Sequence, residues 1–469
     1  MNRKTVSLCL IARDEEASIG MAIKSVLALV DEVIVVDTGS KDNTRIIAEG
    51  YGARVLDVTW EDDFSLARNA CLAEALSDWI LVLDADEFLQ PVRPVEFQRL
   101  LHDPQVAGYR LRMASSLEEE AGRNSTMIRL FRNDPAIRYS YPIYEQISES
   151  LNWWAEKEGL QVKDTNLTIV HEGGQQAAQV QKRQRNQRIL HKAMAEFPIE
   201  PYFPYKMGCA GIQTLDEEVL PTAGLTVALG HLHTAWLRME SRDPKHLQTQ
   251  RWLPDLAIKS SSGLLALDRV EEARNLIQKV GKHFPNDPRV ILQTAAAEIR
   301  YLELHCDDMN PQTSRKMESD IQFRLQELLD RAPESDGFAI DRRILDLYPL
   351  RYLGELALLG GHVSEAVGYF EQALSLDPDY SFAWLGMAEC SRFAGDPKRA
   401  LKLYLRTITE NEWNHRGWMR GCDLMKEMEF QDNAASWWRR VTTQFPEHPA
   451  LKQTDHQAPE ILRPLNPVG

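Results

Sequence analysis

The sequence contains no run of apolar residues long enough to cross a lipid bilayer. Its short apolar N-terminal segment meets the charged residues Arg13 to Glu16 at once, which is too short for the core of a signal peptide. Paired cysteines are also missing, because the six cysteines lie far apart and form no CxxC motif. That spacing fits neither a disulfide framework nor a zinc site, so we expect reduced cysteines in a cytoplasmic protein.

Positive charge is scarce as well: the 469 residues carry a formal net charge of -15. Binding of a nucleic-acid backbone requires a basic surface, so this class of partner is not expected. A small phosphorylated ligand remains compatible with the charge if a metal ion joins it to the protein. Residues 11–15, after the first predicted strand, contain no glycine, which disfavours a dinucleotide-binding dehydrogenase or a sugar nucleotidyltransferase.

The N-terminal part alternates short, nearly continuous apolar segments with helical patterns. This alternation predicts a parallel sheet that helices cover on both faces. In such sheets ligands bind beyond the carboxyl ends of the strands. The predicted strands are residues 6–12, 32–36, 54–58 and 79–83, and the predicted helices are residues 16–30, 42–49 and 64–76.

Downstream the pattern changes to mixed strands, which we expect at residues 108–113, 127–132, 143–148 and 167–170. A polar, basic helix then leads into a second, helical half. The predicted domains are residues 1–175 for the α/β domain, 176–200 for a connecting helix, 201–452 for helical repeats and 453–469 for a C-terminal tail. A chain of this length is too long for one core, so several domains are expected.

The helical half repeats with a fixed period. Ala366, Ala400 and Ala434 recur every 34 residues, and Trp384 and Trp418 have the same separation. Small residues where helices cross and aromatic residues at fixed offsets in a period of 34 are the tetratricopeptide signature. We therefore predict an all-α tetratricopeptide-repeat solenoid after the α/β domain.

The strongest chemical signal is the pair Asp84 and Asp86, which follows the buried strand at residues 79–83. Two carboxylates at a strand end repel one another unless a cation joins them. Oxygen ligands suit Mg²⁺ or Mn²⁺, which use one or two carboxylates together with phosphate oxygens of a substrate. The alternative is a solvated strand end, as expected for the similar motif at residues 377–379 in a repeat turn.

Three more polar residues lie near this edge of the predicted sheet. Asp37 ends the second strand and could accept a hydrogen bond from a base or a ribose, or it could simply cap a turn. Arg68, on the helix before the carboxylate strand, could reach a phosphate or pair with neighbouring acids. Arg13, after the first strand, has the same two interpretations.

Four motifs, at residues 6–16, 31–40, 62–69 and 79–87, resemble bacterial family-2 glycosyltransferases of the GT-A fold, which have a Rossmann-like mixed sheet. Within that family the chain is similar to the branch with C-terminal tetratricopeptide repeats, which includes the sublancin-type peptide glycosyltransferases. The resemblance implies metal-assisted transfer of a sugar, with inversion, from a nucleotide-diphosphate sugar. Uridine diphosphate is the expected nucleotide, and a peptide or protein is the first expected acceptor.

The resemblance also assigns roles to single residues. Asp37 falls near the nucleotide, Arg68 near the phosphates, and Asp84 and Asp86 at the metal and the donor. Glu145 matches the base in a segment that usually ends in Ile-His-Glu-Gln, although Tyr144 replaces the histidine here. His171 matches a histidine near the diphosphate or the metal, although its spacing alone favours a structural role.

Other functions remain compatible with the sequence. The repeats could form an interaction scaffold beside an inactive transferase domain, although Arg68, Asp84, Asp86 and Glu145 are all present. The acceptor could instead be a polysaccharide or lipid-linked glycan. Repeat surfaces commonly bind peptides, and they could also mediate a homodimer.

Overall fold

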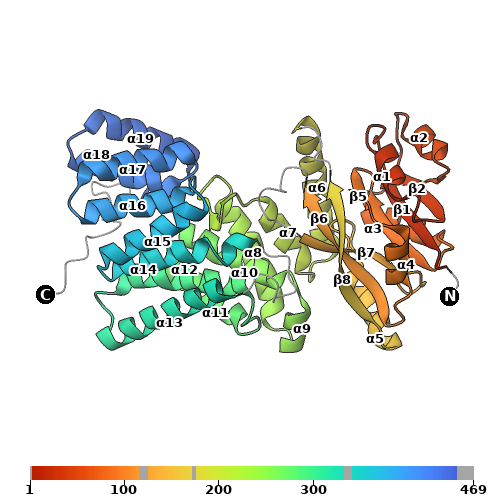
Figure 1. Ribbon diagram of the computed structural model, residues 1–469. Coiled ribbons are helices and arrows are strands. Elements are labelled where there is room, and N and C mark those ends of the chain that lie inside the picture. The colour runs from red at the N-terminus through yellow and green to blue at the C-terminus, as the bar shows by residue number, and fades with distance from the viewer. Residues whose placement is uncertain (1–2, 116–124, 172–175, 332–340, 452–469) are drawn as a thin grey trace. The chain divides into compact units, whose positions relative to one another are not determined.

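The computed structural model describes residues 3–115, 125–171, 176–331 and 341–451, so the predicted tail at residues 453–469 lies outside the described residues. The chain divides into two compact units (Figure 1). The first comprises Met1–Pro198 with Asp336–Asp341, and the second comprises Ile199–Ser335 with Arg342–Gly469. The helix predicted as a connection, α6 (Gln176–Glu196), thus belongs to the first unit. No helix in the described residues is long and apolar enough to span a membrane.

The described part of the first unit contains an eight-stranded mixed sheet in the order β3-β2-β1-β4-β7-β6-β8-β5. The four N-terminal strands β1–β4 are parallel, and β7 adds to β4 in the antiparallel direction. The strands are β1 (Val6–Ala12), β2 (Glu32–Asp37), β3 (Arg54–Asp57), β4 (Trp79–Asp84), β5 (Glu87–Leu89), β6 (Val106–Ser115), β7 (Ser125–Arg132) and β8 (Gln161–His171).

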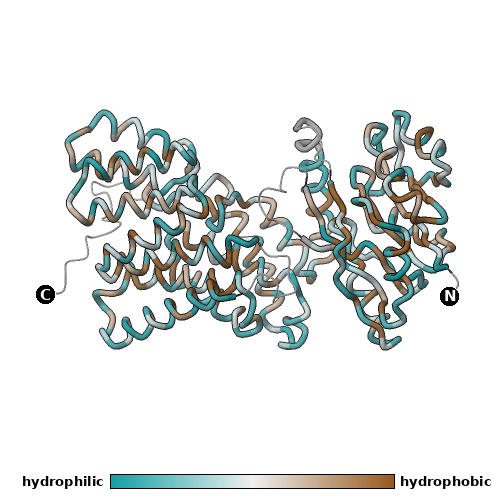
Figure 2. The backbone as a smooth tube through the Cα atoms, viewed as in Figure 1, coloured by the Kyte–Doolittle hydropathy of each residue, from teal (hydrophilic) through white to brown (hydrophobic). Residues whose placement is uncertain are grey.

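Two apolar layers cover the sheet because successive strand residues point to opposite faces. Leu8 of β1 packs toward α1 (Ile19–Val26), α2 (Thr44–Gly50) and α4 (Pro94–Leu101). Its neighbour Cys9 packs on the other face with α3 (Phe64–Ala73) and α5 (Ser148–Glu158). Hydrophobic residues accordingly concentrate along the strands (Figure 2). This arrangement confirms the predicted α/β domain.

One predicted strand is wrong. Residues 143–147 form a loop in which Gln146 makes an isolated bridge with Ser140, and Ser148 already begins α5. Tyr141 and Tyr144 have φ values of 74° and 52°, a left-handed backbone that a strand cannot contain. The loop is tied to the start of α3, because the Phe64 amide donates to the Pro142 carbonyl at 2.9 Å. The apolar pattern there reflects burial of loop residues rather than pairing in the sheet.

Among its described residues, the second unit is helical apart from a two-stranded hairpin, β9 (Thr214–Leu215) and β10 (Glu218–Val219). Its helices are α7 (Tyr202–Ala210), α8 (Leu225–Glu240), α9 (Pro244–Thr249), α10 (Leu253–Ala266), α11 (Val270–Gly281), α12 (Pro288–His305), α13 (Pro311–Asp330), α14 (Tyr348–Leu359), α15 (Val363–Leu376), α16 (Ser381–Phe393), α17 (Pro397–Glu410), α18 (His415–Glu427) and α19 (Gln431–Gln444), with short 3-10 turns η1 (Arg342–Ile344) and η2 (Pro449–Leu451).

The predicted 34-residue repeat corresponds to pairs of these helices. Ala366 and Ala400 are fully buried where helices cross. Phe370 explains two glycines, since a Cβ at Gly354 or Gly386 would lie 2.7 or 2.2 Å from its ring. Such close packing of helix pairs is what a tetratricopeptide array requires.

The two periodic tryptophans connect each helix pair to the loop before it. The indole Nε1 of Trp384 donates to the Pro378 carbonyl at 2.9 Å, and that of Trp418 donates to the Glu412 carbonyl at 2.8 Å. These equivalent hydrogen bonds satisfy a loop carbonyl in each repeat. Both indole N–H groups are therefore used in hydrogen bonds within the repeats.

Candidate active site

The carboxyl ends of three parallel strands bring the predicted donor residues to one edge of the sheet. Ala12 of β1 is opposite Asp37 of β2, and Ile11 is opposite Asp84 of β4. Arg13 follows Ala12 directly, so it lies at the same edge. This is the position where open α/β sheets bind ligands.

Arg68 joins two of the predicted residues. It is buried on α3, a helix that begins with the Asp63 carboxylate accepting from the Leu66 amide. Arg68 Nη2 lies 2.6 Å from Asp84 Oδ1, and Arg68 Nε lies 2.6 Å from Glu145 Oε1. Although burial opposes it, these carboxylates raise the pKa of Arg68 well above its ordinary value. The two bonds use Nε and Nη2, and the charge of this buried guanidinium is balanced by two carboxylates.

A second buried arginine completes the network around Asp84. Arg129 Nη2, on β7, lies 3.2 Å from Asp84 Oδ2 and 2.8 Å from Glu87 Oε1. Burial would raise the pKa of Asp84, but Arg68 and Arg129 hold it well below its ordinary value. Burial, together with the charge of Asp84, raises the pKa of Glu87 to about 7. Asp84 is therefore a fixed carboxylate whose two oxygens are both bound by arginine.

Asp86 occupies a different environment, in the turn between β4 and β5. Its Oδ1 lies 3.4 Å from His171 Nδ1, and its Oδ2 lies 3.4 Å from Lys182 Nζ on α6. Backbone pairing of Glu87 with His171 brings the end of β8 to this turn. Burial would raise the pKa of Asp86, but the hydrogen bond from His171 lowers it, and the same bond raises the pKa of His171.

Asp86 and His171 fit a divalent metal better than Asp84 does. A carboxylate and an imidazole lie next to each other there, and the contacts of Asp86 with His171 and Lys182, both 3.4 Å, are longer than the arginine bonds of Asp84, 2.6 and 3.2 Å. Within the described ranges no group of three or more His, Cys, Asp or Glu side chains could hold a metal ion. Mg²⁺ and Mn²⁺ often take only one or two protein ligands and complete their shell with water and substrate phosphate. The protein thus offers part of a coordination shell.

Asp37 has the turn-capping contacts that its position suggested. Its Oδ1 accepts from the amides of Gly39 and Ser40, both at 2.8 Å, and the residue is buried. Gly39 has a φ of 105°, which favours glycine in this turn. The cap fixes the backbone at the end of β2, and nucleotide binding by Asp37 stays a prediction.

The sequence did not single out Arg129, Glu87 or Lys182. Arg129 is a charged residue on a strand whose neighbours Leu130 and Phe131 are fully buried, a local signal for an internal ion pair. Lys182, Arg185 and Arg188 recur every three residues, a spacing that places cations on one face of a helix. Their contacts with the sheet edge depend on tertiary packing.

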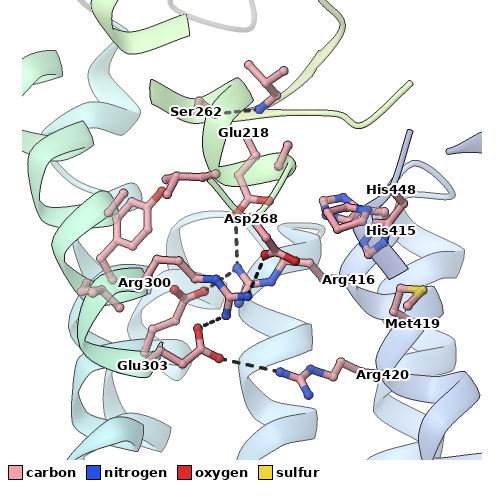
Figure 3. A pocket seen from close by; sticks show the side chains of 18 of the residues that line it. Glu218, Ser262, Asp268, Arg300, Glu303, His415, Arg416, Met419, Arg420 and His448 are labelled. Carbon is pink, nitrogen blue, oxygen red and sulfur yellow. Dashed lines mark hydrogen bonds and ion pairs between the residues drawn. The ribbon is translucent and has the colours of Figure 1, made fainter. Parts of the chain in front are cut away.

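The second unit contains its own pocket of about 130 Å³, on the inner face of the repeats (Figure 3). His415 and His448 lie side by side, and Arg300 pairs with Asp268 and Glu303. Burial lowers the pKa of His415 to about 3 and that of His448 to about 4, so both are neutral. The charged groups here are paired with one another, which favours a structural role over catalysis.

Comparisons with known proteins agree with the geometry of the first unit. Residues 7–154 match Glycosyl transferase family 2. This part of the chain is therefore a family-2 glycosyltransferase domain, and together with its mixed sheet it confirms the predicted GT-A fold.

Similar proteins match parts of the chain. A TPR repeat-containing protein of Synechococcus elongatus is 36% identical over 217 residues, 45% of this chain and 53% of that protein. An uncharacterized glycosyltransferase of Rickettsia felis is 45% identical over 87 residues, 18% of this chain and 29% of its own. SPbeta prophage-derived glycosyltransferase SunS of Bacillus subtilis is 25% identical over 145 residues, which are 30% of this chain and 34% of that protein. The chain spans about half the length of the first of these relatives.

Among solved structures, glucosyl-3-phosphoglycerate synthase from Mycobacterium tuberculosis, in complex with Mn²⁺, UDP-glucose and phosphoglyceric acid, is 22% identical. The similarity covers 38% of this chain and 74% of that chain, with a TM-score of 0.30. That score is too low for a comparison of the two sites.

Proposed function

We propose that the protein transfers a sugar from a nucleotide-diphosphate sugar, with uridine diphosphate as the expected nucleotide, to a peptide or protein acceptor. The arrangement at the carboxyl end of β4 carries this proposal. There the Asp86 carboxylate lies 3.4 Å from His171 Nδ1 and from Lys182 Nζ, while Asp84 is fixed by Arg68 and Arg129. Dehydrogenases and nucleotidyltransferases, the competing classes, lack support because no glycine-rich loop follows β1.

Asp86 and His171 are the residues proposed to hold the divalent metal, Mn²⁺ or Mg²⁺. When bound, the metal neutralises the negative charge that develops on the leaving diphosphate. The protein contributes a rigid support for this turn, because the Asp84 amide donates to Glu87 Oε2 at 2.8 Å. A direct role of Asp84 in metal binding would require one of its arginine bonds to open.

Glu145 is proposed as the base that takes the proton from the acceptor. In the inverting reaction the acceptor atom bonds to the anomeric carbon, the bond from that carbon to the diphosphate breaks, and the proton goes to the carboxylate. Arg68 holds Glu145 in one orientation through the 2.6 Å bond to Oε1. The second oxygen, Oε2, is the one proposed to accept the proton.

The test uses the full-length protein with Asp86→Asn, which keeps the shape of the side chain and weakens metal coordination. We expect Mn²⁺ binding, measured by electron paramagnetic resonance, to weaken, and donor hydrolysis and transfer to fall steeply. Asp164→Asn, at an exposed position of β8, is the matched control. Full activity of the wild type in excess EDTA, or an unchanged metal affinity of the variant, would refute the metal site.

The acceptor requires a separate experiment. The support for a peptide or protein is the sequence similarity to peptide glycosyltransferases that carry repeats. Mass spectrometry of glycopeptides from the native host, with and without the gene, should reveal hexose-modified peptides that disappear in the deletion strain. Loss of a glycolipid or polysaccharide, with glycopeptides unchanged, would favour the other acceptor classes.

A further inference from the structure

The phosphates of a nucleotide donor need cations that the protein has not already neutralised. Arg68, the arginine expected near the phosphates, directs Nε to Glu145 and Nη2 to Asp84. Arg129 likewise donates hydrogen bonds from Nη2 to Asp84 and Glu87. Free cations must therefore come from other elements at this edge of the sheet.

Helix α6 brings three cations to that edge. Lys182, Arg185 and Arg188 are separated by three residues each, so they lie on one face over about 9 Å of helix. Lys182 reaches Asp86, and Arg188 pairs with the Asp62 carboxylate at 2.9 Å. These contacts fix the rotation of the helix, so that the middle residue of the three also faces the sheet edge.

Arg185, the middle residue, has no carboxylate partner among the described residues. Its guanidinium packs over the Phe64 ring at 5.0 Å and donates to the amide oxygen of its neighbour Asn186 at 3.2–3.3 Å. Asp62, whose charge acts favourably on Arg185, is already bound by Arg188 and by Trp60 Nε1. A half-buried guanidinium is thus satisfied only by an aromatic face and a neutral oxygen.

Arg13 follows β1 at the same edge of the sheet. Its side chain is exposed at the end of β1, and it forms no hydrogen bond or ion pair with another described residue. Burial, and then the nearby charge of Arg13, lower the pKa of Arg185. The charge of Asp62 opposes this effect, and an anion bound between the two guanidiniums would remove their repulsion.

We propose that Arg13 and Arg185 form an anion-binding site that receives the phosphates of the nucleotide donor, with Lys182 as a third cation one turn along α6. This site rests on the proposed function. It would give α6 a role in donor binding in addition to linking the two units. A guanidinium donates two parallel hydrogen bonds to a phosphate, which a packed aromatic ring helps to orient.

The experiment measures binding of UDP, uridine and inorganic pyrophosphate to the full-length protein by titration calorimetry in the presence of Mg²⁺. The variants are Arg13→Met, Arg185→Met and the charge-conserving Arg185→Lys. Arg183→Met is the matched control, because this exposed arginine lies on the same helix outside the face formed by residues 182, 185 and 188. Thermal unfolding of each variant checks that the fold is retained.

Loss of either guanidinium should weaken UDP and pyrophosphate binding by about 10- to 100-fold, and leave uridine binding unchanged. Arg185→Lys should lie between the wild type and Arg185→Met. Equal affinity of the wild type and both methionine variants for UDP and pyrophosphate would overturn the proposal, as would an equal loss of uridine binding.

The proposed function can fail separately. If the wild type bound no UDP but its pyrophosphate binding still depended on Arg185, the anion site would stand and the assigned nucleotide would be wrong. If UDP binding needed Asp86 and the metal but neither Arg13 nor Arg185, the transferase function would stand and the anion site would be refuted.

Discussion

Arg68 couples the proposed base to the donor side of the site, because one guanidinium holds both Glu145 and Asp84 at 2.6 Å. Glu145→Gln keeps an oxygen that accepts from Arg68 Nε and removes the basic carboxylate. We expect sugar transfer to fall by about 10²–10⁴-fold, with donor affinity nearly unchanged. Transfer kinetics and calorimetric UDP binding measure the two effects.

The control for this substitution is Glu149→Gln, an exposed acid a few residues downstream at the start of α5. It should transfer at the wild-type rate. If Glu145→Gln also transferred at that rate, the base would be another residue. If it lost UDP binding instead, Glu145 would act through Arg68 on the donor and not on the acceptor.

At the scale of elements, the hairpin β9–β10 inserts acids among the repeat helices. Arg351 of α14 is fully buried and pairs with Glu217 and Glu218, and the Tyr380 hydroxyl donates to Glu217 Oε1 at 2.9 Å. Glu217 Oε2 has no hydrogen-bond partner within the described residues. Burial, with smaller effects from Asp216 and Glu218, raises the pKa of Glu217 to about 7.

This raised pKa predicts a pH dependence of stability. Between about pH 4.5, where the unfolded chain loses the proton, and pH 7, the folded protein binds more protons. The contribution of Glu217 is therefore fully present below pH 4.5 and is lost as the pH rises through 7. The glutamine of Glu217→Gln cannot ionise, so the free energy of unfolding of the wild type relative to the variant should fall by roughly 3 kcal/mol from pH 4.5 to 8.

Urea unfolding of both proteins across this pH range measures the difference. Glu371→Gln, at an exposed position on α15, controls for loss of a surface charge. A difference between wild type and Glu217→Gln that stays constant with pH, or that increases, would show that Glu217 ionises normally in the fold.

Local sequence patterns predicted the elements better than the contacts between them. The strand β1 and the start of α3 at Phe64 lie where their patterns placed them, because continuous apolar residues and a capping aspartate are local signals. Residues 143–148 have an apolar pattern too, but the left-handed backbone of Tyr144 within them, and of Tyr141 just before them, overrides it. The helix expected at residues 16–30 is shorter, Ile19–Val26, since the residues before it form hydrogen bonds with the loop after β2.

The same limit applies to the site. Asp84, Asp86 and Arg68 could be found because strand ends and motifs are local features. The pairing of Arg68 with Glu145 joins residues far apart in the sequence, and no spacing rule reports it. The sequence also does not show that Arg68 and Arg129 both pair with Asp84. Because of this pairing, we propose Asp86 and His171, and not Asp84, as the metal ligands.

At the scale of the whole molecule, each unit has hydrophobic cores of its own. The two apolar layers of the sheet draw on residues between Val6 and Ile169, whereas the largest core of the repeats draws on residues between Ile291 and Leu424. Every residue proposed for donor binding, from Arg13 to Arg185, lies in the first unit. Donor chemistry and acceptor recognition should therefore separate when the chain is cut between the units.

A fragment of residues 1–198 should fold cooperatively, bind UDP with Mg²⁺ or Mn²⁺, and hydrolyse the donor at a rate near that of the full-length protein. Its KM for the native acceptor should rise by about tenfold or more, since the repeats are expected to supply acceptor contacts. Circular dichroism, calorimetry and transfer kinetics give the three readouts, and Asp86→Asn in the fragment is the inactive control. A folded fragment with full-length acceptor kinetics would assign the repeats to stability or self-association, and a fragment that folds but no longer binds UDP would place part of the donor site in the second unit.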